Sequence, residues 1–279
     1  MIKYDLIAEQ LLYEGTIEQE NLFKPQRLKR EDLLLTHNEG YWEKLSKLHL
    51  SAQEIRRTGF PLSEALVERE VVIMQGTVQA AEYAMEHGIG MNIAGGTHHA
   101  YADRGAGFCL LNDIAIAARV LLHQQKVKKV LVVDLDVHQG DGTASIFQNT
   151  PEVFTFSMHG HHNYPMHKER SDLDIPLADH TTDAHYLSTL DEHLPRLIDE
   201  VQPEVIFYQS GVDILGTDKL GKLSVTREGC KARDRRVLEL SKRNNIPLVI
   251  SMGGGYSERL TDIVEAHCNT FRLAQEIFF

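Results

Sequence analysis

The feature that most constrains this chain is a short apolar run that leads directly into acidic residues and a histidine. Residues 130–133 are all Val or Leu, which is typical of a strand buried on both faces of a parallel sheet. Asp134, Asp136, His138 and Asp141 follow. Carboxylates this close repel one another unless a cation or a proton lies between them. A strand end with aspartates that cap the next helix would explain one Asp, but not three with a His. Asp136 and His138 are therefore predicted to bind a metal ion, with Asp134 and Asp141 as supporting carboxylates.

Length and composition place the chain among ordinary globular proteins. No repeat, low-complexity tract or linker divides its 279 residues, so residues 1–279 are predicted to form a single domain. The net charge of −11, with no extended basic cluster, argues against nucleic acid as a direct partner. The three scattered cysteines argue against a disulfide framework. Since no signal-peptide core or bilayer-length apolar run is visible either, a cytoplasmic protein with no membrane partner is expected.

Apolar patterning predicts alternating strands and helices after a helical region that extends to about residue 60. Strands are expected at residues 89–94, 130–133, 153–157, 205–209 and 247–251. Long helices are expected at residues 63–85, 112–123, 185–201, 227–244 and 259–277, and a polar surface loop at residues 160–171. Strands that alternate with helices indicate one mainly parallel α/β sheet.

Five loops of this pattern carry residues suited to catalysis. They contain His98 with His99, Phe108, Asp136 with His138, Asp213, and Tyr256. In a parallel sheet the carboxyl ends of the strands share one edge, so these loops are expected to converge there. Asp136, His138 and Asp213 would give a metal ion three protein ligands and leave one position open. That arrangement is typical of catalytic rather than structural sites.

The adjacent histidines and Tyr256 suit hydrolysis of a carbonyl compound. One imidazole could act as a water-activating base and the other could lie near the leaving group, each oriented by a carboxylate such as Asp134 or Asp141. Tyr256 could donate a hydrogen bond to a developing oxyanion. Alone, a His-His pair is more often a surface or packing feature than a catalytic one, and Gly-Gly-Gly-Tyr is more often a turn than part of an active site.

Other features have simpler structural explanations. Tyr41 and Trp42 are expected to be core residues. Cys109 is expected to be a small buried side chain beside the pocket. A polar, solvated loop is preferred to a second metal cluster for the remaining histidines, which are His159, His161, His162 and His167.

Taken together, these motifs resemble those of the zinc-dependent histone deacetylase family, which has the arginase-deacetylase fold. The resemblance extends from about residue 63 to about residue 270, with the motifs in the family's order. They are Gly95-Gly96-Thr97-His98-His99-Ala100, Gly107-Phe108-Cys109, the run from Asp134 to Gly142, Asp213, and Gly254-Gly255-Tyr256. Gln139 and residues 211–223 are most similar to the class IV branch and its bacterial relatives. The fold implied is a single three-layer α/β/α domain with a mainly parallel sheet.

The resemblance implies a role for each matching catalytic position. Asp136, His138 and Asp213 would bind zinc, or iron(II) in its place. The remaining roles concern proton transfer and the carbonyl group. His99 would be the general base and acid, oriented by Asp141, His98 would assist and pair with Asp134, and Tyr256 would polarise the amide carbonyl.

The resemblance also implies substrate contacts and structural potassium. Phe108 would line an acyl-lysine channel, Gly107 would accept a hydrogen bond from the substrate amide, and Gly254 and Gly255 would border the substrate. An inner potassium site would involve Asp134, Asp136, His138, Ser157 and Met158. Part of an outer one would involve Phe147, Thr150 and Val153.

The chain departs from the family pattern at its start. Family members usually begin with a strand before the helix that begins here at Met1, so the usual first edge strand and part of the pocket rim are expected to be missing. A rim aspartate that some branches use also has no counterpart. The prediction is a hydrolase that removes acetyl or other acyl groups from protein acyl-lysine or acylated polyamines by metal-activated water. The alternatives are a manganese-dependent ureohydrolase-like enzyme and a non-catalytic, metal-binding family member.

Overall fold

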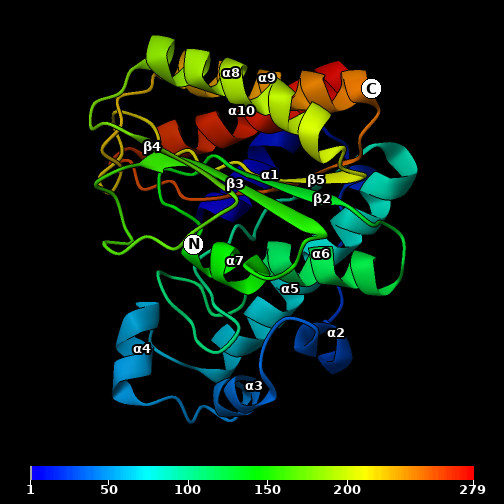
Figure 1. Cartoon of the computed structure of the whole chain (residues 1–279), viewed down its shortest axis with the longest axis vertical. Helices are drawn as coiled ribbons and strands as arrows, with labels where there is room; N and C mark the ends of the chain where they lie inside the picture. The colour runs from blue at the N-terminus through cyan, green and yellow to red at the C-terminus, as the bar shows by residue number, and fades with distance from the viewer. Residues whose placement is uncertain (1) are drawn as a thin grey trace.

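The computed structural model describes residues 2–279, so Met1, where the first helix is predicted to begin, lies outside the described residues. Across residues 2–279, six strands form one fully parallel sheet in the order β1-β6-β5-β2-β3-β4. The strands are β1 (Ile89–Asn92), β2 (Val130–Asp134), β3 (Val153–Gly160), β4 (Leu173–Leu177), β5 (Val205–Gln209) and β6 (Leu248–Ser251). Helices cover both faces of the sheet, which gives three layers (Figure 1).

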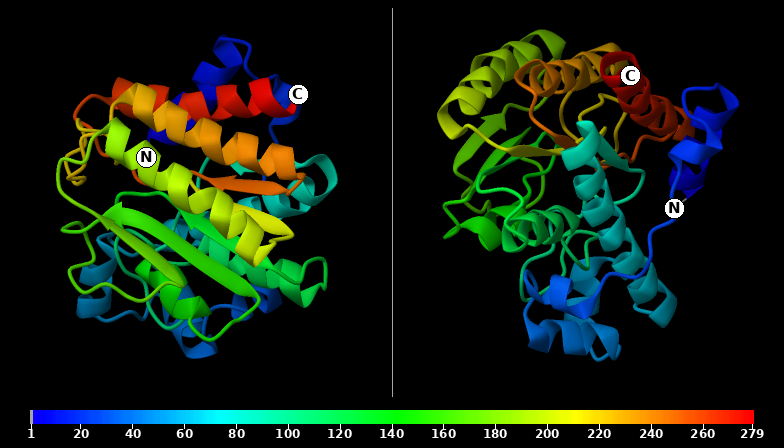
Figure 2. Two further views of the ribbon diagram at one scale, coloured as in Figure 1. Left: turned by 45° about the horizontal axis from the view of Figure 1, so that its top comes forward. Right: turned by 90° about the vertical axis from the view of Figure 1, so that its right-hand side faces the viewer.

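The helices divide between the two faces (Figures 1 and 2). One face is covered by α5 (Glu64–His87), α6 (Asp113–His123) and α7 (Asp141–Phe147). The other is covered by α8 (Asp183–Val201), α9 (Arg227–Asn244) and α10 (Leu260–Phe278). Helix α1 (Ile2–Tyr13) packs on α10, and the short 3-10 helix η1 (Gln19–Asn21) follows it. Next come α2 (Arg30–Leu34), α3 (Glu39–Ser46) and α4 (Ala52–Thr58). None of the helices in residues 2–279 is long and apolar enough to cross a bilayer.

Strand β2 shows why the chain folds into layers. Val130 and Val132 belong to the apolar core shared with α5 and α6, whereas Leu131 and Val133 belong to the core shared with α8, α9 and α10. Successive strand side chains point to opposite faces, so a strand that is apolar at every position needs helices on both sides. The apolar run that stood out in the sequence therefore becomes a central strand.

The register of the central strands determines where the functional loops begin. Asp134 at the end of β2 pairs with Gln209 of β5 and with Ser157 of β3. Gln209 in turn pairs with Ser251, the last residue of β6. The loops that follow β2, β5 and β6 therefore leave the sheet side by side, at its carboxyl edge.

The predicted fold class is confirmed, and the five predicted strands all form. Strand β4 was missed, and helix α4 was not set apart within the helical region expected up to about residue 60. Strand β4 is a partly exposed edge strand that contains Pro176, so it lacks the apolar run of a central strand. Helix α4 is short and is defined by its caps, Ser51 at its start and Gly59 at its end, rather than by an apolar stripe. Tyr41 and Trp42 are buried, as expected.

A substitution in β1 tests how closely this strand packs on α5. A Cβ at Gly90 would collide with the carbonyl oxygen of Ala80. We expect Gly90→Ala to lower the free energy of unfolding by about 1–3 kcal/mol, because the strand must move away from the helix. The control is Gly40→Ala in α3, where a Cβ meets nothing within 4 Å. Urea denaturation measures both variants, and an equal effect would contradict the packing of β1 on α5.

A buried acid on α5 makes stability depend on pH. Burial raises the pKa of Glu70 to about 7 although Arg69 opposes the shift. The folded state therefore binds a proton between pH 4.5 and 7 that the unfolded state releases, so this group favours folding less as pH rises through that window. Between pH 4.5 and pH 8 this group should lower the free energy of unfolding of the wild type by up to about 3 kcal/mol, and Glu70→Gln should not show that loss. Urea denaturation of both proteins at the two pH values measures it. The exposed Glu68→Gln should leave the wild-type pH dependence in place, and the prediction fails if both variants behave alike.

Candidate functional site

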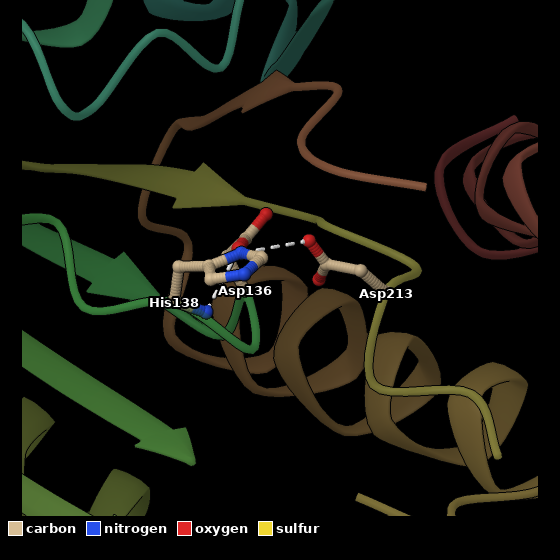
Figure 3. A group of neighbouring side chains, drawn as sticks. All are labelled: Asp136, His138 and Asp213. Carbon is tan, nitrogen blue, oxygen red and sulfur yellow. Dashed lines mark hydrogen bonds and ion pairs between the residues drawn. The ribbon is translucent and has the colours of Figure 1, made fainter. Parts of the chain in front are cut away.

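Three side chains of the kind that bind metals meet at the carboxyl edge of the sheet. Asp136 and His138 lie in the loop after β2 and Asp213 lies in the loop after β5, yet one donor atom from each lies within 4.8 Å of the others. The imidazole of His138 faces both carboxylates (Figure 3). Its Nδ1 is 3.1 Å from Oδ1 of Asp136 and 3.2 Å from Oδ2 of Asp213. All three residues are buried, so the predicted ligands do come together.

Backbone amides keep the two carboxylates in place. The Val137 N–H donates to Oδ1 of Asp213 at 3.0 Å, so the loop after β2 positions a ligand of the loop after β5. The His138 N–H donates to Oδ1 of Asp136 at 3.0 Å, and the Gly254 N–H donates to Oδ2 at 2.7 Å. A Cβ at Gly254 would collide with the carboxylate of Asp213, which explains why a glycine is needed there.

The charges at this point favour a cation. Burial and the neighbouring charge of Asp136 raise the pKa of Asp213 to about 6. Burial acts to lower the pKa of His138, but its hydrogen bonds to Asp136 and Asp213 raise it to about 10. Both shifts show that the two buried carboxylates favour positive charge between them. Two carboxylate oxygens and one imidazole nitrogen form a donor set suited to zinc or iron(II), so these residues fit a divalent metal ion.

Two His–Asp pairs lie beside these ligands. His98 Nδ1 is 2.7 Å from Oδ2 of Asp134, and His99 Nδ1 is 2.6 Å from Oδ1 of Asp141. The two imidazole rings lie 4.1 Å apart, centroid to centroid, so both neighbouring side chains point inward. Nε2 of His98 lies 3.9 Å from Oδ1 of Asp136. Each pairing is the one that the resemblance implied.

The two histidines differ in protonation despite their similar partners. Burial acts to lower the pKa of His98, but the charges of Asp134 and Asp136 raise it to about 9. Burial and the adjacent charge of His98 lower the pKa of His99 to about 4, although Asp141 opposes this shift. One imidazolium and one neutral imidazole therefore stand side by side at neutral pH. Such a division is typical of acid–base sites.

Tyr101 and Glu169 extend the His99 pair, and sequence reasoning missed both. The Tyr101 hydroxyl lies 2.9 Å from Oδ2 of Asp141 and 3.3 Å from Oε1 of Glu169, so one proton faces two acceptors. With Oδ1 paired to His99, a bond to Oδ2 would give each oxygen of Asp141 a donor, which fixes the orientation of the carboxylate. A tyrosine two residues after His99 matches no general spacing rule, so only the fold reveals this contact.

Tyr256 is positioned by a residue on another loop. Its N–H donates to Oδ2 of Asp218 at 2.6 Å, and Oδ1 of Asp218 accepts from the N–H groups of Leu220 and Gly221 at 2.9 Å. Asp218 therefore ties the loop after β5 to the loop after β6. Burial and the charge of Asp213 raise the pKa of Tyr256, so the phenol remains a hydrogen-bond donor at neutral pH.

Aromatic side chains border the site. The Phe108 ring, 45 % exposed, lies 6.1 Å from the Tyr256 ring, centroid to centroid. The Tyr164 ring meets the His99 ring edge-on at 4.8 Å. A Cβ at Gly107 would lie 2.7 Å from His99 Cδ2 and 3.0 Å from Tyr164 Cε1, so this glycine allows a close approach of the backbone. Tyr164 was not predicted, because it lies in a polar stretch expected to be only a surface loop.

The residues proposed for potassium lie on adjoining segments. Ser157 pairs in register with Asp134, and both Ser157 and Met158 are buried in β3. Near the proposed outer site, the Thr150 carbonyl accepts a hydrogen bond from the Val153 N–H at 3.0 Å. Potassium binding at either place stays a prediction.

One expectation about the histidine-rich segment is wrong. His159 does not lie in a solvated loop, because β3 continues to Gly160 and buries this side chain to 1 % exposure. Its Nδ1 lies 2.9 Å from the Ser157 hydroxyl, a partner that the sequence pattern did not indicate. His161 and His162 are exposed, as expected. Cys109 is also buried as expected, and burial raises the pKa of its thiol well above the usual value.

Comparisons with known proteins agree with this geometry. A family model described as the histone deacetylase domain matches residues 1–271. An uncharacterised protein of Picosynechococcus sp. is 42 % identical over 278 residues, covering 100 % of this chain and 93 % of that protein. Histone deacetylase 2 of Arabidopsis thaliana is 32 % identical over 276 residues, covering 94 % of this chain and 70 % of that protein. The crystal structure of the HDA15 HD domain, 19 % identical, matches 96 % of this chain and 81 % of that one with a TM-score of 0.79, which shows the shared fold.

The predicted metal ligands can be tested by thermal unfolding. Zinc that binds the native protein should raise its melting temperature, because a ligand of the folded state stabilises that state. We expect Asp213→Asn to lose most of this shift, since it removes one of the two anionic ligands. Asp199→Asn, an exposed carboxylate on α8, should respond to zinc as wild type does. A full shift in Asp213→Asn would show that zinc binds elsewhere.

Proposed function

The chain belongs to the histone deacetylase family, and from that premise we propose that it is a metal-dependent hydrolase that removes acyl groups from lysine-like amines. One observation carries the proposal. Three buried residues that suit a divalent cation lie next to two buried His–Asp pairs. A metal-binding point beside two imidazoles, each oriented by a carboxylate, provides the groups that amide hydrolysis by water requires.

In this proposal Asp136, His138 and Asp213 hold zinc, with iron(II) as the alternative. A bound zinc ion would supply Lewis-acid polarisation of the scissile carbonyl and would make a neighbouring water more acidic. The third residue of the set comes from a different loop, so the ion would also link the loops after β2 and β5.

His99 is the proposed general base. Its neutral state leaves one ring nitrogen able to accept a proton from the attacking water. Because Nδ1 faces Asp141, that nitrogen is Nε2, and the same nitrogen can later deliver the proton to the leaving amine. His98 is charged beside Asp134, so its proposed role is to assist by stabilising negative charge that develops on the substrate.

Tyr256 is the proposed donor to the oxyanion. The phenol remains protonated, and its backbone is fixed through Asp218. Loss of a donor of this kind typically lowers turnover by 10²–10³-fold in other hydrolases.

The proposed substrate is protein acyl-lysine or an acylated polyamine. Phe108 and Tyr164 would line the passage for the aliphatic part of the substrate, since both rings border the catalytic residues. The Gly107 carbonyl would accept the substrate amide N–H, and Gly254 and Gly255 would border the acyl group. Structural potassium beside Asp134 and Ser157 belongs to the same proposal. A cytoplasmic location is also proposed, supported by three cysteines that are all free within residues 2–279.

The alternatives make different demands on the site. A manganese ureohydrolase needs additional carboxylates that bridge two ions, whereas within residues 2–279 one group of three side chains meets the geometry of a metal site. A non-catalytic family member would bind metal without turnover. Assays with acetyl-lysine peptides, long-chain acyl-lysine peptides and acetylated polyamines, with the bound metal identified, discriminate among the three.

Two substitutions test the catalytic assignments. We expect His99→Ala and Tyr256→Phe each to lower turnover of an acyl-lysine reporter by at least about 100-fold, while zinc content stays near that of wild type. The control is Tyr13→Phe, which removes a hydroxyl from a side chain that is 90 % exposed at the end of α1, and it should keep wild-type turnover. Retained activity in His99→Ala and Tyr256→Phe would refute both assignments.

A further inference from the structure

A fully buried arginine lies behind the candidate metal site. Arg233, in α9, has 0 % exposure and is among the largest fully buried side chains of residues 2–279. It forms an ion pair with Asp234, with Nη2 2.7 Å and Nε 2.9 Å from Oδ1. Its Nη1 donates to the carbonyl oxygens of Leu135 at 3.2 Å and Gly211 at 2.5 Å. One guanidinium therefore contacts both loops that carry metal ligands.

The two carbonyls occupy the point where β2 and β5 part. The strands pair as far as Asp134 and Gln209, and the Leu135 N–H still donates to the Gln209 carbonyl at 3.2 Å. Beyond this point the Val212 N–H donates instead to the Gly254 carbonyl, at 2.9 Å. Leu135 directly precedes Asp136, and Gly211 lies two residues before Asp213. Arg233 thus connects the segments after β2 and β5 at the point where strand pairing between them has ended.

We propose that Arg233 is a positioning residue of the candidate metal site, which fixes the loop of Asp136 relative to the loop of Asp213. The proposal rests on the metal site of the proposed function. Each ligand carboxylate lies within two residues of a carbonyl bonded to the guanidinium, so a change in this contact alters the distance between the ligands. Groups outside the ligand set that orient the ligands typically account for 10–100-fold in metal affinity.

The buried charge is difficult to explain as a source of stability. A buried ion pair is often no more stabilising than apolar side chains of similar volume, since both charges leave water. Here Asp234, which holds the guanidinium, also accepts hydrogen bonds from the Tyr208 hydroxyl and from Thr270 Oγ1, so its carboxylate keeps a second donor when either of these is lost. A planar fork fixed in this way can donate to two carbonyls and a carboxylate at once, which a lysine ammonium on a flexible stem does less well.

The experiment compares Arg233→Met and Arg233→Lys with Tyr208→Phe. Tyr208→Phe is the matched control, because it removes another donor to Asp234 without touching the bonds to Leu135 and Gly211. Hydrogen exchange of the metal-free protein is followed for peptides spanning residues 134–142 and 209–216, and zinc affinity is measured by competition with a chelator. We expect faster exchange in these two segments and a roughly 10–100-fold loss of zinc affinity in Arg233→Met, with neither change in Tyr208→Phe. Arg233→Lys should keep more of the stability than Arg233→Met but recover little of the affinity.

Three outcomes would overturn the proposal. Unchanged exchange in the two segments of both Arg233 variants would overturn it, as would an equal loss of zinc affinity in Tyr208→Phe. Exchange that rises throughout the protein in both Arg233 variants would also overturn it, because Arg233 would then support the whole core. Hydrolysis is not measured here, so a wild-type protein that cleaves no acyl-lysine would refute the proposed function and leave this result intact. If wild type bound no zinc, the metal site would fail and exchange alone would decide whether Arg233 joins the loops.

Discussion

Repulsion among buried carboxylates is the constraint on which the rest of the site depends. Asp134, Asp136 and Asp213 lie within a small volume, and each is at most 3 % exposed. Such charges are stable in a protein interior only beside positive charge. The raised pKa values of about 9 for His98 and about 10 for His138 show how strongly these carboxylates favour positive charge beside them. A divalent cation bound to Asp136, Asp213 and a neutral His138 would supply that positive charge, which is why two carboxylates and an imidazole this close together indicate a metal site.

The parallel sheet converts distant positions in the sequence into this cluster. Alternation and strand ends could be predicted, because the apolar run at Val130–Val133 and the polar residues after it are local signals. The inference that Asp213 joins Asp136 needed the general rule that parallel strands end at one edge. That β2 and β5 are direct neighbours could not be deduced, since 70 residues lie between Asp134 and Val205 and several strand orders satisfy the same pattern. The edge strand β4 was not predicted for a local reason: Pro176 and the exposed positions of the strand give only a weak strand pattern in the sequence.

The supporting residues were the least predictable part of the site. Tyr101, Asp218 and Arg233 act through hydrogen bonds to Asp141, to the Tyr256 backbone and to the carbonyls before the metal ligands. Each lies on a different segment from at least one of the groups that it positions. Contacts to backbone carbonyls are also invisible in the sequence, because every residue has one. A buried arginine in a charged helical pattern is read first as a solvated residue, so only its 0 % exposure reveals the role.

The two His–Asp pairs show how position alone can give one residue type two roles. Each imidazole faces an aspartate at 2.6–2.7 Å, so the partner does not decide which histidine is charged. His98 also lies 3.9 Å from the Asp136 carboxylate, whose negative charge raises the pKa of His98 further. His99 then lies beside a positive ring 4.1 Å away, which disfavours a second proton and leaves it neutral. The carboxylate of Asp136, a predicted metal ligand, therefore acts on the proposed base His99 through the intervening His98: it raises the pKa of His98, and the charge of His98 lowers the pKa of His99.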